Sequence, residues 1–461
     1  MHVTVLATAL LCLAAGSSFV LGRRRALSMA PDGARGLNSL PGYYGWYAAL
    51  WCGVPALAIA VIWAVSASSA LEAVTLLSLP EGAAGSSEAE ISLFFNDLEN
   101  VVSGNISQRS DARELVAAAE DYESLEFRGA ALFFAVGGIV ALGGAALALR
   151  RIHPALAARD RVERAVKAAL MACSTLAVLV TLGIVLSLAT ETVRFFDRVS
   201  PTEFLFGTHW SPQTALRTDQ VGSSGSFGAL PIFSGTLLIT GIAMAVAVPV
   251  GLQSAIYMTC YATHRVRAFA KPLLEVLAGV PTVVYGFFAA LAIGPCVRRA
   301  GTALGLDVAS ESALAAGLIM GVMIIPFVSS LSDDAINAVP RSLHEGSLGL
   351  GATRSETIKR VILPAALPGI ISAFLLAVSR AIGETMIVVM AAGLAANLTA
   401  NPLEAVTTVT VQIVTLLTGD QEFDSAKTLS VFALGLVLFS VTLCLNLVAL
   451  YVVRRFREQY D

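Results

Sequence analysis

Residues 340–370 read PRSLHEGSLGLGATRSETIKRVILPAALPGI and lie between long apolar stretches of the chain. The segment is long enough for two short helices joined by a turn. The run LGLG at 348–351 supplies flexible backbone near that turn. Pro364 and Pro368 lie where the segment returns to apolar sequence, and proline is tolerated in the first turn of a helix. The pattern predicts a projecting helix pair that can pass a rigid-body movement from a soluble partner to the rest of the chain.

Outside this segment the chain is strongly apolar. Of its 461 residues, 56% are hydrophobic and 14% are charged, against roughly 25% charged residues in soluble domains. This composition excludes an ordinary soluble enzyme, and the net charge of −3 argues against nucleic-acid binding. We expect an all-α, polytopic membrane protein with about nine transmembrane helices, each of roughly 20 apolar residues. The predicted spans are 2–21, 43–66, 129–149, 167–189, 232–259, 272–295, 312–330, 369–393 and 428–452.

The basic residues of the loops predict the orientation of these spans. Of the 30 lysines and arginines, 20 lie in the alternate loops that include 331–368 and the C-terminal tail, and 9 lie in the other loops. Positive charge accumulates on the cytoplasmic side of membrane proteins. We therefore expect an external N-terminus and a cytoplasmic C-terminus. Because no basic residue precedes the first apolar run and Arg23, Arg24 and Arg25 follow it, that run is interpreted as an uncleaved anchor rather than a signal peptide.

An acidic external segment, 67–128, divides the chain into two regions. It carries 12 carboxylates, and residues 111–128 are predicted to form a helix that continues into the third span. We interpret its acidic face as a solvated helix surface, the alternative being a surface that repels an anionic substrate. Residues 1–150 are thus expected to form a three-span accessory region. Residues 151–461 are expected to form a six-span domain that contains the cytoplasmic loop 331–368.

The spacing within residues 340–370 resembles the EAA loop of ABC importer permeases. That pattern is Glu-Ala-Ala, three residues, Gly, nine residues, Ile, one residue, Leu-Pro. This chain departs from it only by Gly346 and Ser347 for the two alanines and by Val361 for the isoleucine. The resemblance implies a loop that couples the permease to a separate ATPase. Its contact residues would be Glu345, Gly346, Gly351, Val361, Leu363 and Pro364.

Four further stretches resemble the PstC-type permease of phosphate-specific ABC importers. They are residues 203–212 (EFLFGTHWSP), 228–261, 271–288 (KPLLEVLAGVPTVVYGFF) and 378–387 (VSRAIGETMI). The resemblance covers about 165–455 and implies a six-helix type I importer core in a bacterial inner membrane. It also implies a heterodimer with a PstA-type permease, an ATPase dimer on the cytoplasmic side and an external phosphate-binding protein. It assigns no role to the first 150 residues.

Two charges inside a predicted span are candidate functional residues. Arg380 and Glu384 are separated by four residues, so on one helix they share a face and can pair. Charges at bilayer depth are costly and should face protein or water. The planar guanidinium of arginine suits phosphate oxygens, so one interpretation is a transient phosphate site at Arg380 that Glu384 balances when the path is empty. The other is a structural ion pair. The resemblance favours the phosphate site and adds the neighbouring Thr385 to the pathway.

A second candidate is the break at 279–282 (GVPT) inside the predicted span 272–295. Unwound backbone in a membrane is tolerated only where it is buried in protein or lines a cavity. Thr282 and Tyr285 would then be hydrogen-bond donors of a translocation pathway, unless the break is only a packing kink. Lys271 and Glu275 are expected to form an interfacial pair. The aromatic residues of 201–212 are expected in the interfacial belt, the alternative being contact with a solute-binding protein.

The sequence contains neither a phosphate-binding loop nor a metal-ligand pattern. No G-x-x-x-x-G-K-[ST] motif occurs, so the ATP hydrolysis that the resemblance implies must come from a partner subunit, and no cofactor is expected. The six cysteines are scattered and form no C-x-x-C pair. Three alternatives to phosphate import are a permease for another oxyanion, a secondary transporter or channel, and a phosphate sensor that signals through its cytoplasmic face.

Overall fold

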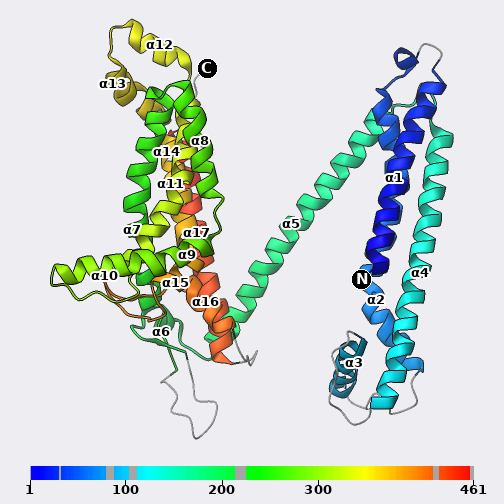
Figure 1. Cartoon of the computed structure of the whole chain (residues 1–461), viewed down its shortest axis with the longest axis horizontal. Helices are drawn as coiled ribbons and strands as arrows, with labels where there is room; N and C mark the ends of the chain where they lie inside the picture. Colours follow the sequence, from blue (N-terminus) through cyan, green and yellow to red (C-terminus); the bar gives the residue numbers. More distant parts are fainter. Residues whose placement is uncertain are drawn as a thin grey trace. The chain divides into compact units, whose positions relative to one another are not determined.

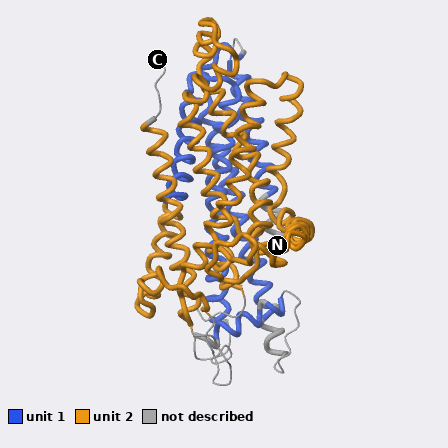
Figure 2. The backbone as a smooth tube through the Cα atoms, turned by 90° about the vertical axis from the view of Figure 1, so that its left-hand side faces the viewer, with its two compact units in different colours: residues 1–178 blue, residues 179–461 orange. Residues whose placement is uncertain are grey.

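The computed structural model describes residues 2–30, 33–78, 88–102, 112–212, 225–418 and 425–456. The chain forms two compact units, 1–178 and 179–461, which divide within the long helix α5 (Ala158–Phe196) (Figure 2). This division falls later in the chain than residue 150, where the sequence predicted the accessory region to end. The difference arises because the N-terminal half of α5 packs with the first unit through Ala158 and Val162.

The first unit is built on three long helices, each of which contacts the other two. Close approach depends on glycines at the crossings. A Cβ on Gly144 would lie 2.0 Å from the carbonyl oxygen of Trp51, and one on Gly22 would lie 2.7 Å from that of Tyr44. Membrane helices pack closely through such small residues. The elements are α1 (His2–Ser28), η1 (Gly33–Gly36), α2 (Pro41–Ser78), α3 (Glu88–Val102) and α4 (Ala112–Arg151).

The acidic segment predicted to be helical is helical in the structure. α4 runs without interruption from Ala112 to Arg151, which confirms the predicted continuation into the third span. The segment also contains α3, which was not predicted from the sequence. α3 packs on α2 and α4 through Leu98, which forms a small apolar cluster with Leu71 of α2 and Tyr122 of α4.

The second unit is a helical bundle with small elements at its ends (Figure 1). Its central helix is α11 (Ala313–Asn337), which packs along α7 (Leu230–Ile256). Gly317 and Gly321 face Ile242 and Val246 of α7 at distances that exclude a larger side chain. The remaining elements are α6 (Pro201–Phe206), β1 (Trp210–Ser211), β2 (Ser226–Phe227), η2 (Tyr257–Tyr261), α8 (His264–Ala278), α9 (Thr282–Phe288), η3 (Ala289–Ile293), α10 (Gly294–Ala303), α12 (Arg341–Gly349), α13 (Arg354–Thr357), η4 (Ile358–Ile362), α14 (Leu363–Ile382), α15 (Met386–Ala391), α16 (Val409–Leu417) and α17 (Ala426–Phe456).

The aromatic residues of 201–212 are mostly internal rather than interfacial. β1 and β2 form an antiparallel pair in which Trp210 lies opposite Phe227. Phe204 is fully buried, and the indole N–H of Trp210 donates to Gln412 Oε1 at 2.9 Å. Phe206 alone of the three aromatic residues stays exposed. The expectation of an aromatic belt was therefore wrong for Phe204 and Trp210, because the β-pair folds them onto the end of the bundle.

Eight helices of the described chain are long and apolar enough to cross a membrane. α1, which begins at the edge of the described residues, covers the first predicted span but is not one of the eight. Two predicted spans have different bounds in the structure. The span predicted at 272–295 is broken after α8, and the candidate span there is Thr282–Ala303, formed by α9, η3 and α10. The span predicted at 369–393 is replaced by one candidate span at Arg354–Ile382. The protein is thus an all-helical polytopic membrane protein, with one short β-pair in the described part of the chain.

Candidate functional site

The segment 340–370 folds as the predicted pair of short helices. α12 starts after Pro340, and the turn that follows it contains Gly351 with φ of +91°. This left-handed backbone is strained for any residue with a Cβ. α13 then begins with a capping box, in which the Thr353 hydroxyl accepts from Glu356 N–H while the Glu356 carboxylate accepts from Thr353 N–H. The pair lies at one end of the bundle, opposite α6 and α16 (Figure 1).

The predicted coupling residues fall into two groups on this helix pair. Glu345 and Gly346 are exposed on α12, and Gly351 is exposed in the turn. Val361 lies in the π-turn η4, and Leu363 and Pro364 begin α14. The first group therefore forms the projecting tip, next to Leu350, which is 92% exposed. The second group forms the junction through which the tip continues into the bundle.

The predicted break in the chain between α8 and α9 is present. α8 ends at Ala278 and α9 begins at Thr282. The hydroxyl of Tyr285 donates to the carbonyl of Leu277 at 2.8 Å, and its ring packs in the core of the bundle. Tyr285 therefore bridges the break, because its hydroxyl satisfies one backbone carbonyl at the end of α8. Thr282 is half-buried at the start of α9.

Arg380 and Glu384 do not occupy one helical face, because α14 ends at Ile382. Glu384 Oε1 instead accepts the backbone N–H groups of Met386 at 3.1 Å and Ile387 at 3.4 Å, at the start of α15. The backbone of this turn is held from α16, whose Thr410 hydroxyl donates to the Glu384 carbonyl at 3.0 Å. The expected ion pair is therefore absent from this part of the described chain. Thr385 is half-buried in the same turn.

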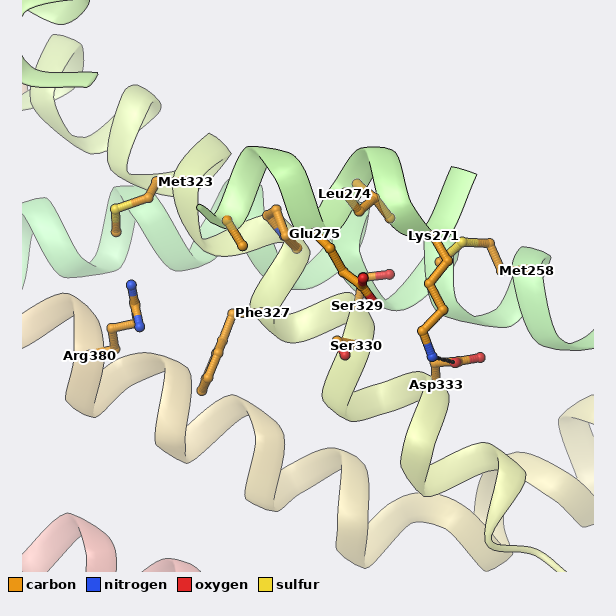
Figure 3. A pocket seen from close by; sticks show the side chains of 12 residues that line it. Met258, Lys271, Leu274, Glu275, Met323, Phe327, Ser329, Ser330, Asp333 and Arg380 are labelled. Carbon is orange, nitrogen blue, oxygen red and sulfur yellow. Dashed lines mark hydrogen bonds and ion pairs between the residues drawn. The ribbon is translucent and has the colours of Figure 1, made fainter. Parts of the chain in front are cut away.

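The guanidinium of Arg380 projects into a cavity of roughly 230 Å³. Its carbon Cζ lies over the ring of Phe327, 5.6 Å from the centroid, at a cation–π distance. Figure 3 shows Arg380 at one end of the cavity and Lys271 with Asp333 at the other. The walls come from η2, α8, α11 and α14, through Met258, Lys271, Leu274, Glu275, Ala278, Met323, Pro326, Phe327, Ser329, Ser330, Asp333 and Arg380.

A buried ionic cluster at the second end of the cavity was not found from the sequence. Asp333, on α11, has a side chain that is 1% exposed. It accepts from Arg267 through both oxygens, at 3.1 and 3.0 Å, from Lys271 at 3.1 Å and from the Thr259 hydroxyl. Asp333 lies just beyond the predicted span 312–330, in the loop expected on the cytoplasmic side. The spacing of Arg267 and Lys271, one helical turn apart, was the signal that could have indicated a shared partner.

The same cluster corrects the pairing expected for Lys271. Its ammonium contacts Asp333 of α11 rather than Glu275 of its own helix. Glu275 is exposed and lines the cavity beyond Lys271. Within the described residues, no group of three or more His, Cys, Asp or Glu side chains has the arrangement of a metal site.

The chain belongs to the family of binding-protein-dependent transport system inner membrane components, which are the permease subunits of ABC importers. The model of that family matches residues 247–458. A second model, described as "Phosphate ATP-binding cassette transporter", matches residues 8–180. The chain is thus a multi-pass membrane subunit that is itself non-catalytic.

The chain aligns with most of the length of several relatives. The chain is 33% identical to the probable ABC transporter permease protein YqgH of Bacillus subtilis, over 62% of this chain and 88% of that protein. It is 32% identical to the phosphate transport system permease protein PstC 1 of Mycobacterium tuberculosis, over 56% of this chain and 83% of that protein. Among solved structures, a bacterial alginate ABC transporter aligns with a TM-score of 0.45 and 16% identity, over 66% of this chain and 99% of that chain.

Proposed function

We propose that this chain is the permease subunit of an ATP-driven importer of inorganic phosphate, and that it forms half of the translocation pathway. The support comes from both regions of the chain. The chain is similar to a phosphate transport permease over 56% of its length, and its residues 247–458 match the permease family. Residues 8–180 match a model described as a phosphate ATP-binding cassette transporter. A PstA-type permease supplies the second half of the pathway.

The choice of phosphate as the substrate rests on the Arg380 guanidinium, which lies in the cavity. Its neighbour in space is the Phe327 ring, and the nearest carboxylate in sequence, Glu384, is engaged at the start of α15. A guanidinium that is not neutralised by a carboxylate is free to receive phosphate oxygens through two parallel N–H donors. Arg380 is then the phosphate contact, and Glu384 and Thr385 shape the turn beside it. Thr282 and Tyr285 belong to the pathway through the α8–α9 break.

The helix pair α12–α13 is the coupling element in this proposal. Glu345, Gly346 and Gly351 at its tip contact an ATPase dimer, and Val361, Leu363 and Pro364 pass the movement to α14. This places the tip and the C-terminus in the cytoplasm and the N-terminus outside, where a phosphate-binding protein delivers substrate. Residues 1–150 are an accessory region of the same subunit in the bacterial inner membrane.

A permease for another oxyanion is the second candidate, because YqgH carries only the general description of a probable ABC transporter permease. The guanidinium geometry suits sulfate as well as phosphate. A secondary transporter or channel is not favoured, because such a protein has no use for an ATPase docking element.

The test is uptake of radiolabelled phosphate in cells whose chromosomal copy carries Arg380→Gln. We expect uptake to fall by at least about tenfold, since a charge-assisted contact in the path is lost. The matched control is Arg299→Gln, which removes the same charge from an exposed position of α10. Excess unlabelled sulfate should not compete in wild-type cells. Competition by sulfate, or normal phosphate uptake by the Arg380→Gln protein at normal abundance, would contradict the assignment.

A further inference from the structure

Helix α8 is held to the bundle in an unusual way. None of its residues is buried, and Phe269 and Val276 are 75% and 67% exposed. Among the described residues, the side-chain hydrogen bonds from α8 to the rest of the bundle come from two cations, Arg267 and Lys271, which reach the buried carboxylate of Asp333. One wall of the cavity is therefore fixed to α11 by a charge cluster rather than by a packed apolar face.

Lys271 is the replaceable member of that cluster. Arg267 alone bonds both carboxylate oxygens of Asp333, and the Thr259 hydroxyl donates to one of them. The Lys271 bond is the fourth hydrogen bond to a carboxylate that already accepts three, two from one Arg267 nitrogen and one from Thr259. The Lys271 side chain is 36% exposed and lines the cavity, whereas Asp333 is almost completely buried. Its ammonium can therefore turn to a ligand in the cavity while Arg267 keeps Asp333 satisfied.

The charges around the cavity favour the entry of an anion. Arg267, Lys271 and Arg380 supply three positive charges, and Glu275 and Asp333 supply two negative charges. One further negative charge brings the group to neutrality, which matches the monoanion of inorganic phosphate. The wall between the two ends also contains Ser329, whose buried hydroxyl has no hydrogen-bond partner among the described residues.

We propose that Lys271 forms a second phosphate-binding site, at the end of the cavity opposite Arg380. There the anion replaces Asp333 as the partner of the Lys271 ammonium. This inference rests on the proposed function and extends it from one contact to two. Each site along a transport pathway must bind its ion tightly enough to be occupied and weakly enough to release it. Asp333 provides the second property, because it competes for the same ammonium and displaces the anion from it.

The experiment compares Lys271→Met with Arg265→Met, a variant that removes one exposed positive charge from the same helix. Lys271→Met leaves the Arg267–Asp333 bridge in place, so α8 stays anchored. We expect phosphate uptake in cells to fall about tenfold in Lys271→Met at normal protein abundance. Uptake should be near normal in Arg265→Met and partly restored in Lys271→Arg, which keeps the charge.

A second measurement separates anion binding from anchoring. The assembled transporter, purified without the soluble binding protein, is heated in inorganic phosphate and in chloride at equal ionic strength. We expect phosphate to raise the melting temperature of the wild type and of Arg265→Met, and to raise that of Lys271→Met by clearly less, because a ligand stabilises only the sites it fills.

Two results would contradict a second phosphate-binding site at Lys271. One is wild-type uptake together with a full phosphate-dependent rise in Lys271→Met, and the other is an equal loss in Arg265→Met. A failure of the proposed function would look different. In that case phosphate uptake by wild-type cells would not depend on the presence of this chain.

Discussion

The guanidinium of Arg380 lies over the ring of Phe327, with Cζ 5.6 Å from the ring centroid, and does not pair with Glu384 four residues along the chain. The two charges that the sequence places together therefore have separate roles in the structure. Glu384 stabilises the start of α15 by accepting two backbone N–H groups, while Arg380 faces the cavity.

The first prediction follows from this separation. Arg380→Gln and Glu384→Gln should act independently, so that their effects on stability add within about 0.5 kcal/mol. Glu384→Gln keeps an oxygen acceptor for Met386 N–H and should retain much of the phosphate uptake, whereas Arg380→Gln should not. Arg380→Lys keeps the charge but loses the planar fork, and partial uptake at most is expected. Melting curves of the two single variants and the double variant, together with uptake, provide the check.

A double variant that is more stable than either single variant would show that the two side chains do form a pair. Near-normal uptake by the double variant would show in addition that the path needs no cation at this position. In that case the structural interpretation of both residues would replace the phosphate site.

The second prediction concerns Gly351 in the turn between α12 and α13, the proposed coupling element. Gly351→Asp places a Cβ on backbone with φ of +91°, at a cost of about 1–2 kcal/mol, and adds a charge at the tip. We expect the bundle to fold but co-purification of the ATPase to decrease. Gly349→Asp is the matched control, because it adds the same side chain two residues earlier, at a helical position with open space around its Cβ. Equal loss in both variants would attribute the effect to charge rather than to the turn.

The third prediction concerns the bond between Tyr285 and Leu277 across the break. Tyr285→Phe keeps the buried ring and removes only the hydroxyl, so it should destabilise the bundle by about 1 kcal/mol. Tyr257→Phe, at an exposed position in η2, should leave the melting temperature unchanged. The check is thermal unfolding of the purified protein in detergent. If Tyr285→Phe melts with the wild type but loses uptake, its hydroxyl acts in the pathway rather than in packing.

The fourth prediction concerns the accessory region. A chain that begins near Arg161 keeps almost all of α5 and every element of the second unit. We expect it to insert and to assemble with the partner permease, measured by co-purification from membranes. A complete failure to insert or assemble would show that α1, α2 and α4 are needed for the fold of the permease itself.

Much of the local structure was predictable from residue type and spacing. The polar stretch with Gly351 predicted a helix–turn–helix because a glycine allows the left-handed turn that the backbone adopts there. The GVPT sequence predicted the break between α8 and α9, since proline has no backbone N–H to continue the helix. The helix predicted over 111–128 is confirmed for the described residues 112–128, again from local sequence alone.

The pairing of charges was not predictable in this way. Spacing alone suggested two pairs, Arg380 with Glu384 and Lys271 with Glu275, and neither is formed. Gly383 ends α14 before Glu384, so the i, i+4 geometry does not exist there. Lys271 lies on an intact helix with Glu275, but a carboxylate on α11 with 1% exposure competes for it. A buried carboxylate needs a cation far more than an exposed one does.

The sequence by itself determined the class of the protein, its membrane-spanning character and the projecting helix pair α12–α13. Those properties depend on apolar run length, charge distribution and short-range backbone preferences, all of which are local. Only the tertiary structure decided which charges share the cavity. Asp333 meets Arg267 and Lys271 across more than sixty residues of chain, and such a meeting depends on how α8 lies against α11. Arg380 likewise faces that cavity because α14 packs along α11, a relationship that no spacing within either helix encodes.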